Sequence, residues 1–308
     1  MDAISTLIRM ARLEASVDVR CLLTGSHTLD NPPRPPGEVP FHVLLEGRCV
    51  AESGGRPLEL SAGDVLVLPR AGRHRLRVVA TEMPPVPADL RDGASVTTLS
   101  SDGVPSVDLF CGHYTYRPGA GALLFDGLPD VLHASFGMGG GSPLRPLGEL
   151  MRTEASSDGP GAGALLASLC EALLALALRD GGSNERRSTA FSGPWTAVVD
   201  PGLQAVVNAV VHDPGRPWTL AGLATVAGVS RATLVRRFSA ATGVGVAEFL
   251  TRTRMTVAAD LLTTTDRGLD DIAASVGYRS ASAFGRAFRT VTGTTPARLR
   301  RATALRGA

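Results

Sequence analysis

Two patterns of apolar residues follow one another along the chain, one with the spacing of strands and one with the spacing of helices. Residues 1–15 carry apolar side chains at helical spacing and predict a short amphipathic helix. Between residues 17 and 116, short apolar runs alternate with turn-forming segments, as expected for an antiparallel sandwich or barrel. The predicted strands lie in five runs: Val19–Leu23, Phe41–Leu45, Val65–Leu68, Leu76–Val79 and Val107–Phe110.

Helical patterns dominate the remainder. Leu144–Met151 and Leu165–Leu178 have almost no β-branched residues. The second is so apolar that we expect one face to meet another subunit, to pack on the chain's own barrel, or both. Asp180–Ser192 is polar and rich in glycine and serine, which predicts a linker over residues 181–199, and a helical pattern resumes at Pro201–Val211. The sequence therefore predicts an α+β protein with domains at 1–180 and 200–308.

The last hundred residues contain a near-repeat at an offset of about fifty residues. Each copy predicts a helix, a glycine turn and a second helix. The turn needs a glycine because the chain reverses through a positive φ angle. Ser230 and Ser280 lie where they would cap the second helices. The matching positions are Leu223-Ala224 with Ile272-Ala273, Ala227-Gly228-Val229 with Val276-Gly277-Tyr278, Phe238 with Phe288, and Gly243 with Gly293.

Each second helix is predicted to have one buried and one exposed face. The spacing of four residues places Leu234 with Phe238, and Phe284 with Phe288, on one face. Arg236 and Arg286 lie between these pairs and therefore point almost oppositely. A guanidinium there can give two parallel hydrogen bonds to guanine or can clamp phosphates. The candidate DNA contacts are Arg231, Ala232, Val235, Arg236, Arg237, Arg279, Ser280, Ser282, Gly285, Arg286 and Arg289.

Charge supports a polyanionic partner for this part of the chain. Residues 215–308 contain 14 arginines and five acidic residues, whereas residues 1–214 contain 17 arginines and 24 acidic residues. The overall charge of +2 thus combines a basic segment of +9 with an acidic one of −7. Double-stranded DNA is the expected partner, and an ordinary solvated basic surface is the alternative. All 31 basic residues are arginine, which favours a GC-rich bacterial genome.

The repeat resembles the DNA-binding domain of AraC/XylS-type regulators. The first half matches over 218–238, with Gly243 and 248–250, and the second over 272–288, with 293–296. The resemblance implies seven helices, two helix-turn-helix units, and a long helix joining them at about Ala247–Thr263. Recognition helices would enter successive major-groove segments. Val246 stands where the family usually has proline, and Thr253 where it has an aromatic residue, so local packing is in doubt there.

The N-terminal part is similar to the cupin domain of a subgroup of these regulators, over 41–49, 63–74, 111–114 and 128–129. The paired His-x-His and the Glu of the first cupin motif are missing. His42, His74 and His113 are still candidate metal ligands, but without that pair the ligand set is incomplete. We expect no cofactor and no enzyme activity. The alternative is a cupin metalloenzyme of the dioxygenase or isomerase kind with an accessory DNA-binding domain.

The four cysteines are scattered, without a Cys-x-x-Cys pair, so they predict neither a zinc site nor a disulfide framework. Cys21, Cys49 and Cys111 are candidates for redox sensing, and the alternative is that each is a small buried apolar residue.

No apolar run approaches the roughly 18 to 20 residues that span a bilayer, and residues 1–10 lack a secretory signal, so we expect a cytoplasmic protein without a membrane partner. The resemblance further implies a homodimer, contact with RNA polymerase, activation of transcription, and an unknown small-molecule or oxidant effector.

Overall fold

The computed structural model describes residues 3–79, 86–116, 121, 124–125, 128–157, 159–181 and 200–304. The chain divides into two units, which are described separately. The β-rich unit comprises Glu14–Thr115 and Asp130–Gly181, and the helical unit comprises Met1–Leu13, Tyr116–Pro129 and Gly182–Ala308.

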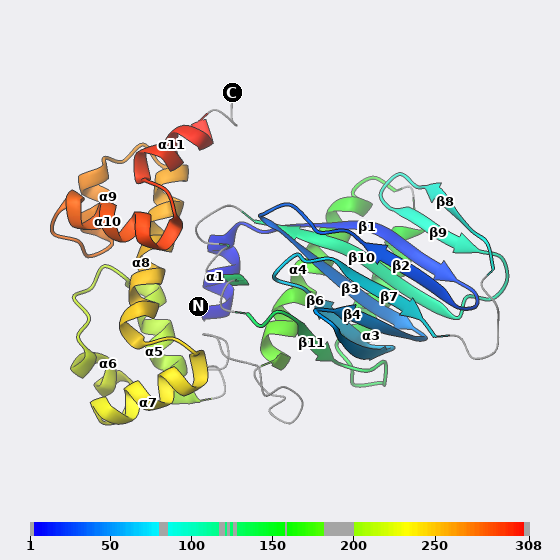
Figure 1. The fold of residues 1–308 in the computed structure, drawn as a ribbon, viewed down its shortest axis with the longest axis horizontal. Helices are drawn as coiled ribbons and strands as arrows, with labels where there is room; N and C mark the ends of the chain where they lie inside the picture. Colours follow the sequence, from blue (N-terminus) through cyan, green and yellow to red (C-terminus); the bar gives the residue numbers. More distant parts are fainter. Residues whose placement is uncertain are drawn as a thin grey trace. The chain divides into compact units, whose positions relative to one another are not determined.

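Two facing sheets form the β-rich unit (Figure 1). The larger has seven strands in the order β11-β6-β3-β10-β1-β9-β8, and the smaller has the order β2-β7-β4-β5. Leucine, valine and cysteine side chains fill the space between them. The strands are β1 (Glu14–Leu23), β2 (His27–Asn31), β3 (Glu38–Glu46), β4 (Arg48–Ser53), β5 (Arg56–Ser61), β6 (Asp64–Val67), β7 (His74–Val78), β8 (Ala88–Asp92), β9 (Thr97–Ser101), β10 (Val107–Thr115) and β11 (Leu132–Ser135).

All five predicted strand runs fall in or at the end of a strand, so the predicted barrel is confirmed. The structure adds strands that the apolar pattern did not reveal, among them β8 and β9, whose side chains are mostly exposed or half-buried. It also departs from a purely antiparallel arrangement, because β1 and β9 pair in parallel.

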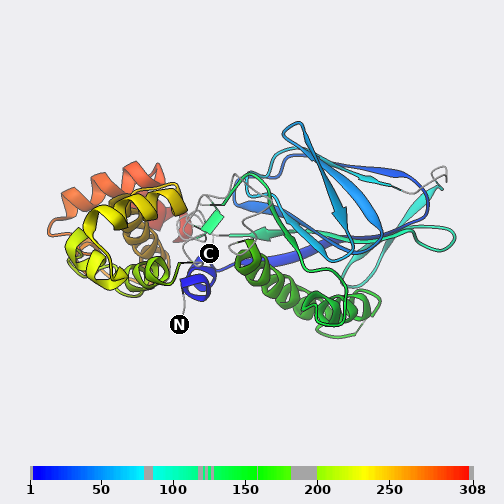
Figure 2. The ribbon, with the colours of Figure 1, turned by 90° about the horizontal axis from the view of Figure 1, so that it is seen from below.

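Helices α3 (Leu144–Ala155) and α4 (Ala162–Gly181) cover the outer face of the larger sheet, as the green helices of Figure 2 show. The Tyr114 hydroxyl donates a hydrogen bond of 2.7 Å to the Cys170 carbonyl. Gly148 allows α3 to approach β3, since a Cβ there would lie 2.7 Å from Leu45 Cδ2. The predicted packing of α4 on its own barrel is thus confirmed.

The expectation that no segment is long enough to cross a membrane is wrong for α4. Among the described helices, α4 meets that requirement by length and composition alone. The apolar composition of α4 is explained by its packing inside the protein. The buried side chains are those of Leu166, Cys170, Leu173, Leu174, Ala177 and Leu178. It is therefore a core helix of this fold.

A buried ion cluster joins α3 to the sheet. Asp108 on β10 accepts hydrogen bonds from Arg20 Nε and Nη2, both at 3.0 Å, and from Arg152 Nε at 2.6 Å. Arg20 and Asp108 are 7% and 3% exposed, so the loss of either side chain would leave the other as an unpaired buried charge.

The helical unit contains α1 (Ala3–Ala11) and seven helices between residues 200 and 304, the number implied by the resemblance. The N-terminal helix ends earlier than the predicted 15 residues because Arg12 adopts φ 46° and β1 begins at Glu14. It packs against α5, within the same unit. The helices are α5 (Pro201–His212), α6 (Leu220–Ala227), α7 (Arg231–Thr242), α8 (Val246–Thr264), α9 (Leu269–Ser275), α10 (Ala281–Thr292) and α11 (Pro296–Ala304).

Residues 182–199, nearly all of the predicted linker, lie outside the described residues. The division at 1–180, 181–199 and 200–308 stays a prediction.

The two turn glycines differ in their surroundings, so alanine should destabilise the protein by different amounts at the two positions. Gly228 (φ +67°) has open space where a Cβ would be, whereas at Gly277 (φ +84°) a Cβ would lie 2.8 Å from the Gly215 carbonyl oxygen and 2.7 Å from Arg254 Nη2. Gly228→Ala should cost about 1 kcal/mol through the left-handed backbone alone. Gly277→Ala should cost roughly 1–3 kcal/mol more, because backbone must shift. Urea unfolding of the two variants measures this difference, and equal losses would contradict it.

Candidate nucleic-acid interface

Each turn-helix unit is defined by a side-chain cap. Ser230 Oγ accepts the Thr233 amide at 3.2 Å at the start of α7, and Ser280 Oγ accepts the Ala283 amide at 3.3 Å at the start of α10. Both predicted N-caps are confirmed. The Ser280 hydroxyl, also a candidate DNA contact, is thus already engaged with its own helix.

The predicted anchors are buried. Leu234, Phe238, Phe284 and Phe288 are at most 1% exposed. The Phe238 ring lies 5.5 Å from the Phe249 ring on α8, and the Phe284 and Phe288 rings are 5.6 Å apart. These contacts set the rotation of α7 and α10 about their own axes.

The opposite faces of α7 and α10 reach solvent. Arg236 and Arg286 are both exposed, and Val235 keeps 43% of its surface accessible. Ala232 and Ser282 are exposed and Gly285 is half-buried. Among the residues that the structure describes, five arginine side chains of this set form no ion pair: Arg231, Arg236, Arg279, Arg286 and Arg289.

Arg237 differs from the other candidates. Its Nη2 lies 3.6 Å from Asp200 Oδ2, and Asp200 also caps α5 by accepting the Gly202 amide at 3.0 Å. The sequence pattern placed Arg237 among the candidate DNA contacts, whereas the structure places it beside a carboxylate of the same unit.

Two further arginines support the scaffold rather than the exposed faces. Arg254 donates to the carbonyls of Pro214 (2.8 Å) and Arg216 (3.0 Å), and Arg300 donates to those of Leu262 (3.4 Å) and Arg267 (2.6 Å). Burial lowers the pKa of Arg254. The position of Arg254 was visible in the sequence, but its long-range carbonyl partners were not. Part of the basic charge is therefore structural.

The barrel interior brings two of the three candidate histidines together. His42 Nε2 and His74 Nε2 are 2.8 Å apart, and His74 Nδ1 lies 3.0 Å from the Gly72 carbonyl. Because a carbonyl only accepts, His74 carries its proton on Nδ1, and its Nε2 accepts from His42. His42 Nδ1 is then free to accept from the Cys111 thiol at 3.1 Å.

Both imidazoles are neutral. Burial, and then the neighbouring His74, lower the pKa of His42 to about 3. Burial also lowers the pKa of His74. The pair forms a hydrogen-bonded chain that needs no bound ion to satisfy it.

His113 does not join this pair. Its Nδ1 lies 3.0 Å from Asp18 Oδ1, and its Nε2 lies 3.9 Å from Glu38 Oε2. Within the described part of the chain, no group of three or more His, Cys, Asp or Glu side chains could hold a metal ion. The three candidate ligands therefore do not converge.

All four cysteines are buried and free. A hydrogen bond with Cys21, together with burial, raises the pKa of the Cys111 thiol well above its usual range. Burial, and then Asp64, raise the pKa of Cys49 to about 12. Burial, and then Glu171, raise the pKa of Cys170 to about 12. The structure thus brings Cys21 and Cys111 together and leaves Cys49 outside their hydrogen-bonded chain.

Comparisons with known proteins agree with this two-part architecture. A cupin family model matches residues 2–181, and a helix-turn-helix domain model matches residues 223–302. An AraC-like transcription regulator of Streptomyces lividans is 34% identical, over 85% of this chain and 86% of its own. The chain belongs to the AraC-type transcription regulators. It is a bacterial DNA-binding regulator with an N-terminal cupin domain.

Two further similarities concern the whole chain and its DNA-binding part. The RCS-specific transcriptional activator RclR of Escherichia coli is 26% identical over 97% of both chains. The solved DNA-binding domain of AdpA, in complex with a target DNA, is 34% identical over 35% of this chain and 96% of that one, with a TM-score of 0.33.

The neutral histidine pair makes stability depend on pH. An unfolded imidazole has a pKa near 6.5, whereas that of His42 in the fold is about 3. As pH falls below 6.5, the unfolded chain therefore binds the proton first, and the free energy of unfolding decreases. His42 should account for a loss of about 2 kcal/mol between pH 7 and pH 5. Urea titrations at several pH values should show a shallower loss for His42→Gln.

His27→Gln is the matched control, since His27 lies in the same unit and is only half-buried. It should keep the pH slope of the unmodified protein. A His42→Gln protein with an undiminished slope would show that His42 is not held neutral.

Proposed function

We propose that the protein is a homodimeric transcription activator that reads an operator through α7 and α10 and responds to an effector at its cupin domain. The observation that carries the proposal is the pair of capped helices, each with a buried aromatic anchor and an exposed, unpaired arginine on the opposite face. Such a protein acts in the bacterial cytoplasm, where the chromosome and RNA polymerase are.

The arginines divide into two roles. Arg236 and Arg286 lie mid-face, where a guanidinium reaches guanine O6 and N7 in the major groove. Arg231, Arg279 and Arg289 lie at the helix ends and flanks, where phosphates are contacted. The exposed residues Ala232, Val235 and Ser282 and the half-buried Gly285 are small or apolar and suit contact with thymine methyl groups. Arg237 would have to leave Asp200 before it could bind a phosphate.

Replacing the mid-face arginine tests the base-reading role. Arg286→Ala should weaken operator binding by roughly 1–3 kcal/mol and relax specificity at one base pair. Arg289→Ala should instead weaken binding to all sequences and reduce the salt dependence by about one counterion. Fluorescence anisotropy with operator and scrambled DNA, at several salt concentrations, measures both.

Arg252→Ala is the control, because Arg252 pairs with Glu248 at 2.6 Å on α8, outside the proposed contact face. It should bind operator as the unmodified protein does. Equal operator affinity of the Arg286→Ala and Arg252→Ala proteins at physiological salt would refute the role of Arg286.

We assign the dimer contact to the outer faces of α3 and α4. Leu150 and Leu165 remain 41% and 46% exposed there, and Ala164 and Ala172 continue the exposed apolar face of α4. Small residues at this spacing allow a second helix pair to approach closely. A twofold-related copy would bury this face against itself.

A charge on this face should separate the subunits. Leu165→Arg should produce a monomer in sedimentation velocity, because a twofold contact would bring two unpaired guanidiniums together. Val104→Arg changes an 86% exposed apolar residue on the loop before β10, outside the two helices, and should leave the dimer intact. Identical sedimentation of the two variants would exclude this face.

The oxidant form of the effector proposal rests on Cys21 and Cys111, which are in contact, and on the similarity to RclR. Thiolates are the reactive form, and the raised pKa of Cys111 keeps its thiol protonated in the closed barrel. An oxidant would therefore act only when the barrel opens. A small molecule bound from outside needs no such opening, and we favour it.

A further inference from the structure

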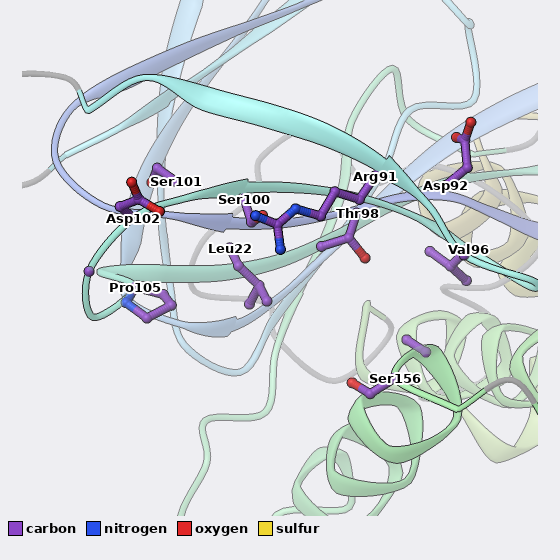
Figure 3. Close-up of a pocket in the computed structure, with 13 residues that line it drawn as sticks. Leu22, Arg91, Asp92, Val96, Thr98, Ser100, Ser101, Asp102, Pro105 and Ser156 are labelled. Carbon is purple, nitrogen blue, oxygen red and sulfur yellow. The ribbon is translucent and has the colours of Figure 1, made fainter.

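The β-rich unit has a cavity of about 540 Å³ outside the core between its sheets. Strands β1, β8 and β9, the loop before β10 and the end of α3 line it (Figure 3). Cavities of this size hold small organic molecules.

Strand register explains why polar side chains gather here. Arg91, Thr98 and Arg20 lie in one cross-strand row of β8, β9 and β1, and Ser100 pairs with Leu22 in a second row. Residues two apart on a strand point to the same side of a sheet. The face beside α3 therefore presents two hydroxyls and a guanidinium around the apolar side chain of Leu22.

These groups are available for a ligand. Figure 3 shows the Arg91 side chain extended over the middle of the cavity, near Ser100 and Thr98, with Asp102 at one end. Among the described residues, the side chains of Arg91, Thr98, Ser100 and Asp102 form no ion pair or hydrogen bond with one another or with other groups. Asp92, at the other end, already accepts the Thr97 hydroxyl at 3.1 Å.

We propose that this cavity binds the effector and that the effector is a small hydroxylated carboxylic acid. The planar fork of Arg91 matches a carboxylate with two parallel hydrogen bonds. Thr98, Ser100 and the Asp102 carboxylate can bind hydroxyl groups, as donors or acceptors. The two acidic residues of the lining oppose a polyanion such as a nucleotide, so a single carboxylate with several hydroxyls fits best.

The cavity also has a route to the proposed dimer helices, and in this respect the inference rests on the proposed function. Ser156, at the end of α3, lines the cavity and accepts a hydrogen bond of 3.0 Å from Arg20 Nη1. Arg20 in turn holds Asp108, which also binds Arg152 of α3. A ligand that contacts Ser156 would therefore affect the ion cluster that holds α3 against the sheet.

Calorimetry on the full-length protein with glycerate, gluconate and quinate tests the site. At least one of these hydroxy acids should bind, while acetate, which lacks hydroxyls, and glycerol, which lacks a carboxylate, should bind at least about ten-fold more weakly. Arg91→Ala should weaken hydroxy-acid binding by about ten-fold or more, and Thr98→Val with Ser100→Ala should do so as well. Arg77→Ala, an exposed arginine on the smaller sheet that pairs with Glu52, is the control and should bind normally.

Two results would overturn the proposal: that none of the three hydroxy acids binds, or that the Arg91→Ala protein binds them as the Arg77→Ala protein does. Operator binding by the same preparations is measured separately by anisotropy. Intact operator binding without hydroxy-acid binding overturns this site alone, whereas lost operator binding in the unmodified protein overturns the proposed function.

Discussion

Burial of one aromatic anchor in each second helix is the constraint on which the DNA-binding unit depends. Because a helix has a fixed 3.6 residues per turn, the direction of one side chain fixes the directions of all the others. The position of Phe238 or Phe288 therefore decides where every other side chain of that helix points. Phe238 packs against Phe249 on the long helix α8, and Phe288 belongs to the core that α8 shares with α9 and α10. The exposed arginines are a consequence of what is buried.

The second constraint is the order of cap and turn. A left-handed glycine ends the first helix region and a serine hydroxyl starts the next, so only a few residues separate α6 from α7 and α9 from α10. Arg254 reinforces this order by binding the carbonyls of Pro214 and Arg216 and lying over the Tyr278 ring, 5.8 Å from its centre. The basic charge of this unit thus serves two purposes, because some guanidiniums hold the scaffold and others remain free in solvent.

In the β-rich unit, neutral polar groups lie between the sheets and a charged cluster lies outside them. In its interior, the imidazoles of His42 and His74 and the thiol of Cys111 satisfy one another between the sheets, without charge. Its cluster of Arg20, Asp108 and Arg152 lies on the outer face of the larger sheet, where it holds α3. The outer cavity lies beside this cluster, next to hydroxyls that have no partner among the described residues. A ligand there would meet polar groups without disrupting the core.

The sequence by itself determined the local elements and their order. Short apolar runs such as Phe41–Leu45 and the serine caps of α7 and α10 depend on neighbours along the chain, so their patterns can be recognised without a fold. The near-repeat likewise predicted that Arg236 and Arg286 would be exposed, because four-residue spacing alone separates them from their anchors. Only the tertiary structure decided which distant groups meet. It paired His42 with His74 but His113 with Asp18, gave Arg237 an acidic neighbour, and placed Arg91 beside Thr98. These outcomes depend on strand register and helix packing between residues far apart in the chain, and no local pattern encodes them.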